Sequence, residues 1–224
     1  MPPRVIVLAS GKGGVGKSTL ARALAAYWLS LGHRPALIDA DPQGSIINLH
    51  DSEGPMGSVL VVADPQAETI AATIAELSAT HAPVVVDTAG FRNQTTIMAA
   101  ISADVVLIPL KPAAEDVREA VSMLDLVREL NATPERLHRP IQAALVLTMV
   151  TPGTVIARQV RRELEKAGYP LLETEVAQRV AFPELSMRGL APSLVDPDSA
   201  AARDVGRLAA EIATLKDSSH VEAA

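Results

Sequence analysis

A glycine-rich segment with two lysines is the clearest chemical pattern in this chain of 224 residues. Residues 11–19 read G-K-G-G-V-G-K-S-T and match G-x-x-x-x-G-K-[ST], the phosphate-binding loop. Glycines let successive backbone N–H groups turn toward an anion and approach it closely. Lys17 is expected to reach the β- and γ-phosphates of a nucleotide, and the Ser18 hydroxyl is expected to bind Mg²⁺. The alternative is a glycine-rich turn between a strand and a helix, without a ligand.

Acidic residues follow two further apolar segments, at positions where strands are expected to end. The first is D-A-D-P-Q-G at 39–44, and the second is V-V-V-D-T-A-G at 84–90. Ligands of open α/β sheets bind at the carboxyl ends of the strands. Asp87 fits the acid that holds Mg²⁺ through water in phosphate-loop enzymes. For Asp39 and Asp41 the alternative is structural, with Asp41 starting a turn that Asp39 caps.

The elements that must position these residues alternate between apolar strands and amphipathic helices. This order predicts a three-layer α/β fold, in which helices flank a doubly wound, mostly parallel sheet. The expected strands are 5–9, 34–39, 57–63, 84–90, 104–109 and 141–148, and the expected helices are 20–31, 67–79, 111–130, 155–168 and 199–215. We expect one domain over 1–216 and a disordered tail over 217–224.

Composition excludes several classes of protein. The chain has no cysteine, which rules out disulfides, thiolate metal sites and cysteine-held iron–sulfur clusters. No apolar run approaches the ~20 residues that span a bilayer, and the first strand begins too early for a signal peptide, so we expect a cytoplasmic protein. The net charge of −6 means that any contact with nucleic acid needs a local basic patch.

The two-lysine loop and the D-x-D-P-Q string at 39–43 together resemble the deviant phosphate-loop ATPases of the ParA/MinD family, most closely its small ParA-type members. The resemblance implies ATP and Mg²⁺ as cofactors. It also implies that Lys12 reaches across a homodimer to the partner's nucleotide. By the same resemblance Asp39 organises the Mg²⁺ shell and the attacking water, and Asp41 belongs to a nucleotide-sensing switch. The alternative for Lys12 is a surface lysine that raises the local potential.

The resemblance thus gives a set of site residues. The catalytic set is Lys12, Lys17 and Asp39, and the metal set is Ser18, Asp39 and Asp87. The nucleotide-binding set is Gly11, Lys12, Gly13, Gly14, Val15, Gly16, Lys17, Ser18, Thr19, Asp41, Thr148 and Met149. Relatives carry an Asn near the adenine, where this chain has Thr148 followed by Met149.

The D-T-A-G turn at 87–90 departs from the D-x-P-P form of ParA relatives and resembles the turn of GTPases. A GTPase switch is therefore one alternative function. A guanine site normally needs N-K-x-D after a late strand, and T-M-V-T at 148–151 does not supply it.

Basic residues gather in the last third of the chain. ParA-type relatives bind DNA non-specifically through this region in the ATP-bound dimer, and phosphate contacts of this kind carry no sequence information. The candidates are Arg158, Arg161, Arg162, Lys166, Arg179 and Arg188. The alternative for the helix 155–168 is a solvent-exposed face on which Glu163 and Glu165 pair with the arginines.

The sequence therefore predicts a ParA-type partition ATPase. It would dimerise with ATP, bind nucleoid DNA, and hydrolyse ATP when stimulated by a ParB-like or centromere-binding adaptor, so driving plasmid segregation. A positioning ATPase for a protein cargo, such as a carboxysome or a chemoreceptor cluster, is the second alternative. No membrane partner is expected, because the tail lacks the amphipathic helix of MinD-type relatives.

Overall fold

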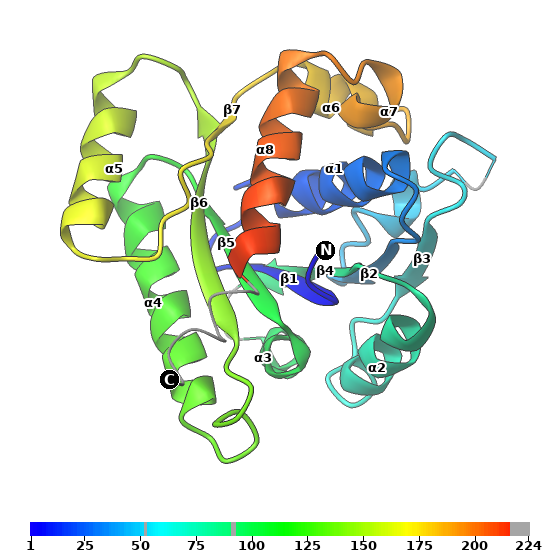
Figure 1. Cartoon of the computed structure of the whole chain (residues 1–224), viewed down its shortest axis with the longest axis horizontal. Coiled ribbons are helices and arrows are strands. Elements are labelled where there is room, and N and C mark those ends of the chain that lie inside the picture. The colour runs from blue at the N-terminus through cyan, green and yellow to red at the C-terminus, as the bar shows by residue number, and fades with distance from the viewer. Residues whose placement is uncertain (52, 91–92, 216–224) are drawn as a thin grey trace.

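A seven-stranded sheet forms the centre of the molecule, with strand order β3-β2-β4-β1-β5-β6-β7. The computed structural model describes residues 1–51, 53–90 and 93–215 (Figure 1). Every strand pairing is parallel. The strands are β1 (Val5–Ser10), β2 (Ala36–Ala40), β3 (Leu60–Ala63), β4 (Val84–Gly90), β5 (Val105–Leu110), β6 (Gln142–Val150) and β7 (Val176–Ala177).

Helices cover both faces of the sheet, which gives the expected three layers. They are α1 (Lys17–Ser30), the 3₁₀ helix η1 (Ile47–Leu49), α2 (Ile70–Thr80), α3 (Gln94–Ser102), α4 (Ala114–Asn131), α5 (Val155–Lys166), α6 (Ala181–Ser186), α7 (Pro192–Val195) and α8 (Ala200–Leu215). One core lies between the sheet and α2 to α5, and the other lies between the sheet and α1, α7 and α8. Burial on both faces explains why the inner strands β1, β4 and β5 are mainly continuous apolar runs, whereas the edge strand β3 is partly exposed.

The order of the strands brings the acidic strand ends to the glycine loop. β1 lies between β4 and β5, because the chain first builds outward through β2 and later crosses to the other side of β1. Loops that leave in opposite directions open a crevice at the carboxyl end of the central strand. Asp39 is in register with Asp87, and Leu8 is also paired with Asp87. The loop that follows β1 therefore lies next to both carboxylates.

Two parts of the fold differ from the sequence-based expectation. The sequence does not predict helix α3, because its first turn carries Thr95 and Thr96, which are buried although they are polar. In α5, the apolar pattern places Val155 and Ile156 inward, but they are 68% and 50% exposed. The buried residues of α5 are Ala157, Val160 and Leu164, so the expected apolar stripe is wrong in the first turn.

The tail predicted over 217–224 lies outside the described residues, and the single domain over 1–216 stays a prediction. Within the described part of the chain, the structure contains no helix of the length and hydrophobicity that crossing a membrane requires.

Candidate functional site

The glycine loop joins β1 to α1 with backbone angles that only glycine adopts easily. Gly14 and Gly16 have φ values of 73° and 91°. Gly16 is the N-cap of α1, and no side chain caps the helix there. The N–H groups of the first helical turn therefore point into the loop without an intrahelical partner, and the helix dipole adds positive potential. This geometry suits a phosphate group.

Lys17 is a buried cation at the start of α1. Its Nζ lies 3.0 Å from the Ser10 Oγ. Burial lowers the pKa of Lys17, while the charges of Asp87 and Asp41 oppose this effect. No described carboxylate lies within ion-pair distance of this ammonium, so it retains donors for an anion.

Asp87 is a buried carboxylate without a protein partner. It is completely inaccessible to solvent, and neither of its oxygens makes a hydrogen bond of normal geometry to a described residue. Burial raises the pKa of Asp87 to about 7, although the Ser18 hydroxyl and Lys17 lie near enough to lower it in part. A buried carboxylate beside a hydroxyl is an oxygen donor set that Mg²⁺ accepts. The residues present therefore fit the metal that the loop motif implies.

Asp39 holds the segment that follows β2. Its Oδ2 accepts hydrogen bonds from the N–H groups of Ile46 and Ile47, at 2.8 and 2.9 Å. Its Oδ1 accepts a longer bond of 3.3 Å from the Asp41 N–H. Asp41 in turn accepts from the Gln43 N–H at 2.9 Å. The two acids thus shape the loop 41–47, and Asp41 also lines a cavity beside the glycine loop.

Two cavities adjoin the loop. The first, which we call the loop cavity, measures about 400 Å³ and is lined by Gly13, Gly14, Gly16, Lys17, Ser18, Thr19 and Asp41 among others. The second, the side cavity, measures about 550 Å³ and lies between Gly16, Leu20 and the segment 176–183. Its lining is largely apolar and includes Phe182 and Pro183. Such a surface suits a planar base better than a charged group.

Lys12 contacts its own chain in this structure. Its Nζ lies 2.7 Å from Glu115 Oε2 and 3.2 Å from Asp116 Oδ1, both at the start of α4. These hydrogen bonds raise the pKa of Lys12. Gly11 allows this approach, because a Cβ at that position would collide with the side chain of Glu119. Lys12 lines neither the loop cavity nor the side cavity.

The Thr148 hydroxyl is bonded to the main chain, while the residue itself lines the side cavity, and its assignment to the nucleotide stays a prediction. The hydroxyl donates to the Val15 carbonyl oxygen at 2.9 Å, with the Leu110 carbonyl oxygen at 3.3 Å. It therefore ties the glycine loop to β5 and β6. Met149 has a positive φ of 52° and lines both cavities. Its backbone geometry places the side chain over the helix end rather than in the sheet.

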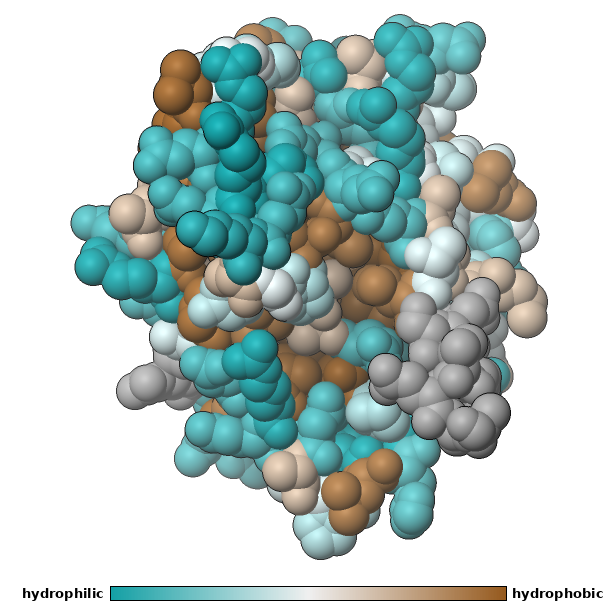
Figure 2. Space-filling view, turned by 60° about the vertical axis from the view of Figure 1, so that its left-hand side comes forward, coloured by the Kyte–Doolittle hydropathy of each residue, from teal (hydrophilic) through white to brown (hydrophobic). Residues whose placement is uncertain are grey.

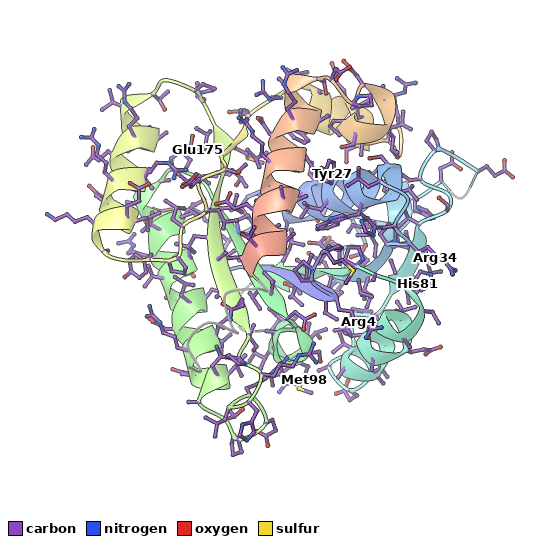
Figure 3. The ribbon with its side chains drawn as sticks, viewed as in Figure 1. Arg4, Tyr27, Arg34, His81, Met98 and Glu175 are labelled. Atoms are coloured by element: carbon purple, nitrogen blue, oxygen red, sulfur yellow. The ribbon has the colours of Figure 1, made fainter. Side chains whose placement is uncertain are left out.

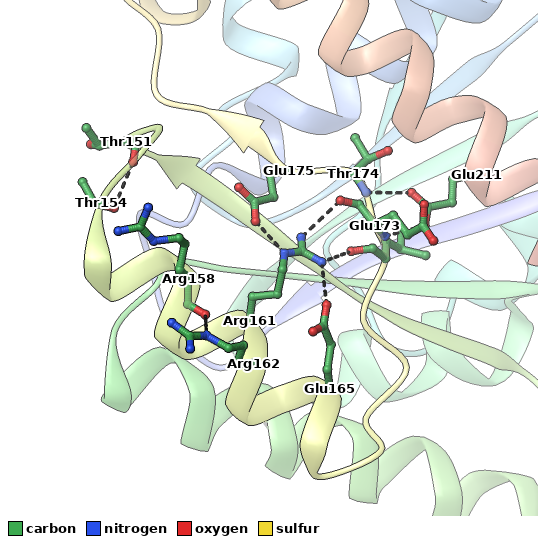
Figure 4. Close-up of polar contacts among 11 residues, drawn as sticks. Thr151, Thr154, Arg158, Arg161, Arg162, Glu165, Glu173, Thr174, Glu175 and Glu211 are labelled. Carbon is green, nitrogen blue, oxygen red and sulfur yellow. Dashed lines mark hydrogen bonds and ion pairs between the residues drawn. The ribbon is translucent and has the colours of Figure 1, made fainter.

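The six basic candidates do not form one face. Figure 4 shows the Arg161 guanidinium directed toward Glu165, Glu175 and the main chain before β7, at distances of 2.7 to 3.3 Å. Figure 3 shows Glu175 beside α5. Arg179 pairs with the buried Asp204 at 2.9 Å. These two arginines therefore hold parts of the chain together, and their assignment to a DNA surface stays a prediction.

The remaining basic candidates are exposed. The side chains of Arg158 and Arg162 point away from the Arg161 network (Figure 4). Among the described residues, Arg162 donates one hydrogen bond, of 3.3 Å, to the Arg158 carbonyl oxygen. Lys166 lies one turn further along α5, and Arg188 lies apart, after α6. In Figure 2 the side of the molecule that carries α5 is mostly hydrophilic, with apolar residues in a hollow near its centre.

Sequence reasoning missed part of the site. Arg22 and Ser186 line the loop cavity, and 176–183 closes the side cavity. Arg22 could have been identified from the sequence, because it interrupts an otherwise apolar helix one turn after Ser18. For Ser186 and the segment 176–183, the sequence does not show that they approach the glycine loop, because that contact depends on the path of the chain after β6.

A parallel α/β sheet whose central strand ends in this loop defines a phosphate-loop nucleotide-binding domain. Residues 6–192 match the family described as the CobQ/CobB/MinD/ParA nucleotide binding domain, and the chain belongs to that family. This confirms the ParA/MinD resemblance.

Relatives of known role resemble the chain over most of its length. It is 30% identical to Protein ParA of Rhizobium radiobacter over 187 residues, which cover 83% of both chains. It is 27% identical to the maintenance of carboxysome distribution protein A of Halothiobacillus neapolitanus, covering 83% of this chain and 84% of the relative. Among solved structures, the septum site-determining protein MinD of Pyrococcus horikoshii, complexed with Mg-ADP, superposes with a TM-score of 0.75 at 14% identity, covering 95% of this chain and 96% of that one. This last likeness confirms the fold.

Proposed function

We propose that this protein is a ParA-type ATPase that binds ATP with Mg²⁺, dimerises in the ATP state and binds DNA non-specifically as a dimer. A partner of the ParB or centromere-adaptor kind stimulates hydrolysis, and the cycle moves a plasmid or another DNA cargo. The observation that carries the proposal is the second loop lysine, Lys12, which stands at the surface outside the nucleotide cavities. Membership of the family and the ParA relative support it.

The chain's own residues divide the work on the triphosphate. The loop amides and the Lys17 ammonium bind the phosphates, and Ser18 and Asp87 hold the metal. Mg²⁺ held there would neutralise negative charge that develops on the phosphate oxygens. Asp39 orients the attacking water. An ionised carboxylate offers about four lone-pair sites. Three sites of Asp39 accept main-chain hydrogen bonds, which leaves one for the water.

The side cavity is the proposed place of the adenine. Its wall is apolar, with Leu20 and Phe182 available to pack on a base. The segment 148–151 contains no Asp that would pair with guanine, and the Thr148 hydroxyl is occupied by the loop. These two observations favour ATP over GTP.

DNA retention at equilibrium tests the proposed cycle most directly. We expect the protein to bind arbitrary duplex DNA with ATP, and to bind weakly with ADP or without nucleotide. Binding should also fall as salt rises, because released counterions drive it. Doubling a weak basic patch in a dimer adds ~10²–10⁴ in avidity without a new contact. Equal retention in all three nucleotide states would contradict the proposal.

The α5 arginines supply a specific prediction for that assay. Replacing Arg158 and Arg162 together by alanine should weaken ATP-dependent DNA binding about 10-fold or more. The salt slope should also fall by about 1 for each phosphate that the variant no longer neutralises. The reason is that both side chains are exposed on α5 and that neither guanidinium is paired with a carboxylate of the described residues.

The matched control replaces Arg4 and Arg34, which are also exposed and lie away from α5 (Figure 3). It removes the same charge and should leave retention near the wild-type level. If both double variants lose binding equally, net charge rather than α5 carries the contact. Arg161→Ala should mainly lower thermal stability, since that guanidinium holds the segment before β7.

A protein cargo remains the second candidate, because the carboxysome-distribution relative resembles the chain almost as closely as the ParA relative does. The chemistry of the nucleotide site is the same in both cases. Stimulation assays separate them: turnover should rise with a DNA-bound adaptor for a partition protein, and with a cargo-coat protein for a positioning protein.

A further inference from the structure

Arg22 is a buried cation that forms no ion pair within the described part of the chain. It lies in the second turn of α1, and only 4% of it is exposed. Burial lowers the pKa of Arg22, and no described carboxylate is paired with it. An unpaired buried charge is costly, and proteins normally compensate it with an ion pair or a bound ligand. The position therefore needs an explanation other than packing.

The guanidinium is only half satisfied by hydrogen bonds. Its Nη1 donates to the Oγ of Ser186 at 2.7 Å and to the carbonyl oxygen of the same residue at 3.1 Å. Ser186 is the last residue of α6, so Arg22 caps that helix. Its Nη2 is buried and has no partner among the described residues. Capping of α6 explains the hydrogen bonds of Nη1, but it does not explain why Nη2 is buried without a partner among the described residues.

The helix directs this side chain toward the glycine loop. Arg22 lies one turn after Ser18 and Thr19, on the same side of α1. Long side chains in helices lean toward the N-terminus and cover the preceding turn. Consistent with this, Arg22, Ser18, Thr19 and Ser186 all line the loop cavity.

We propose that Arg22 is a further phosphate-binding residue, whose free Nη2 binds the diphosphate part of the nucleotide after the guanidinium turns toward the loop. The proposal rests on the nucleotide binding proposed above. The diphosphate is the part favoured, because the loop and the first turn of the helix hold the α- and β-phosphates. Nη1 keeps its bonds to Ser186, so an occupied site also fixes α6.

Nucleotide binding by calorimetry tests this role. The probes are MgADP and a non-hydrolysable ATP analogue with Mg²⁺, each titrated into the wild-type protein, Arg22→Met, Arg22→Gln and Ser186→Ala. A hydrogen bond to a charged group leads us to expect that Arg22→Met and Arg22→Gln weaken both nucleotides by about 10- to 100-fold. Ser186→Ala tests whether Arg22 acts through α6: it removes the hydroxyl partner of Nη1 and leaves the charge, so its affinities should fall by less than those of the Arg22 variants.

Each other outcome overturns the inference. Arg22 variants that bind like the wild type show that the guanidinium does not contact phosphate. An equal loss in Ser186→Ala shows that Arg22 acts only through α6, and a loss confined to the ATP analogue shows that the diphosphate is the wrong partner. Arg22→Gln covers the case in which Arg22→Met fails to fold, as judged by melting without nucleotide. If the wild type binds neither nucleotide, the proposed function itself fails, and this inference with it.

Discussion

Lys12→Ala is expected to bind ATP with affinity close to that of the wild type and yet fail to form the ATP-dependent dimer. Lys17 and the loop amides remain to hold the phosphates of the variant's own nucleotide. The cation that the variant lacks is the one proposed to complete the partner's site. Truncating one member of a charge pair across an interface has a large effect, and a two-fold dimer contains the contact twice. We therefore expect the dimer dissociation constant to rise at least about 100-fold.

Lys12 must break two contacts within its own chain before it can reach a partner subunit. In the single chain it is bound to Glu115 and Asp116. The Lys12 and Glu115 side chains are 45% and 69% exposed, so solvent and salt screen much of their attraction. The Lys12–Glu115 pair is thus weak enough to exchange for a triphosphate, and the buried Asp116 still accepts from the Lys111 N–H when Lys12 leaves.

Light scattering with a non-hydrolysable ATP analogue measures the prediction, and calorimetry checks that the variant still binds nucleotide. Lys111→Ala is the matched control. The Lys111 Nζ lies 3.9 Å from where a Cβ on Gly14 would be, so this control also removes one positive charge beside the loop. It should still dimerise. Loss of the dimer in both variants would mean that general positive potential matters, and an intact dimer in Lys12→Ala would reject the proposed role.

The sequence was sufficient for most of the fold because strands buried on both faces leave a continuous apolar run. β1, β4 and β5 could be placed within a residue or two for this reason. Helix α3 could not, because two of its buried residues, Thr95 and Thr96, are polar and break the apolar period. Tertiary packing, not local preference, decides such a helix.

The sequence also located the phosphate end of the site, since the loop and the acids after β2 and β4 are contiguous motifs. The sequence could not predict contacts between segments that lie far apart along the chain. Lys12 meets α4, Thr148 holds the loop from β6, and Arg22 meets α6, each across about a hundred residues or more. The sequence also could not distinguish the members of the basic cluster on α5. Of Arg158, Arg161 and Arg162, it is Arg161 whose guanidinium contacts the segment before β7.

Asp39→Ala is expected to stop hydrolysis while ATP still binds, so that the variant accumulates as the ATP dimer on DNA. An acceptor that orients or deprotonates the attacking water contributes typically about 10²–10⁴ in rate, and the loss should be of that order. The structure adds a second effect. Asp39 is buried and accepts three main-chain hydrogen bonds that hold the loop 41–47. Removing the carboxylate leaves these N–H groups unpaired, which should lower the free energy of unfolding by about 3 kcal/mol.

Asp39→Asn separates the two effects, because its amide oxygen still accepts from the N–H groups of Ile46 and Ile47 while the charge is gone. Single-turnover phosphate release and thermal melting should therefore diverge. Both variants hydrolyse ATP slowly, but only Asp39→Ala melts well below the wild type. A normal rate in Asp39→Asn would show that Asp39 acts by shaping the loop and not through its charge. A normal rate in Asp39→Ala would remove Asp39 from the reaction altogether and point to Asp41, which lines the loop cavity.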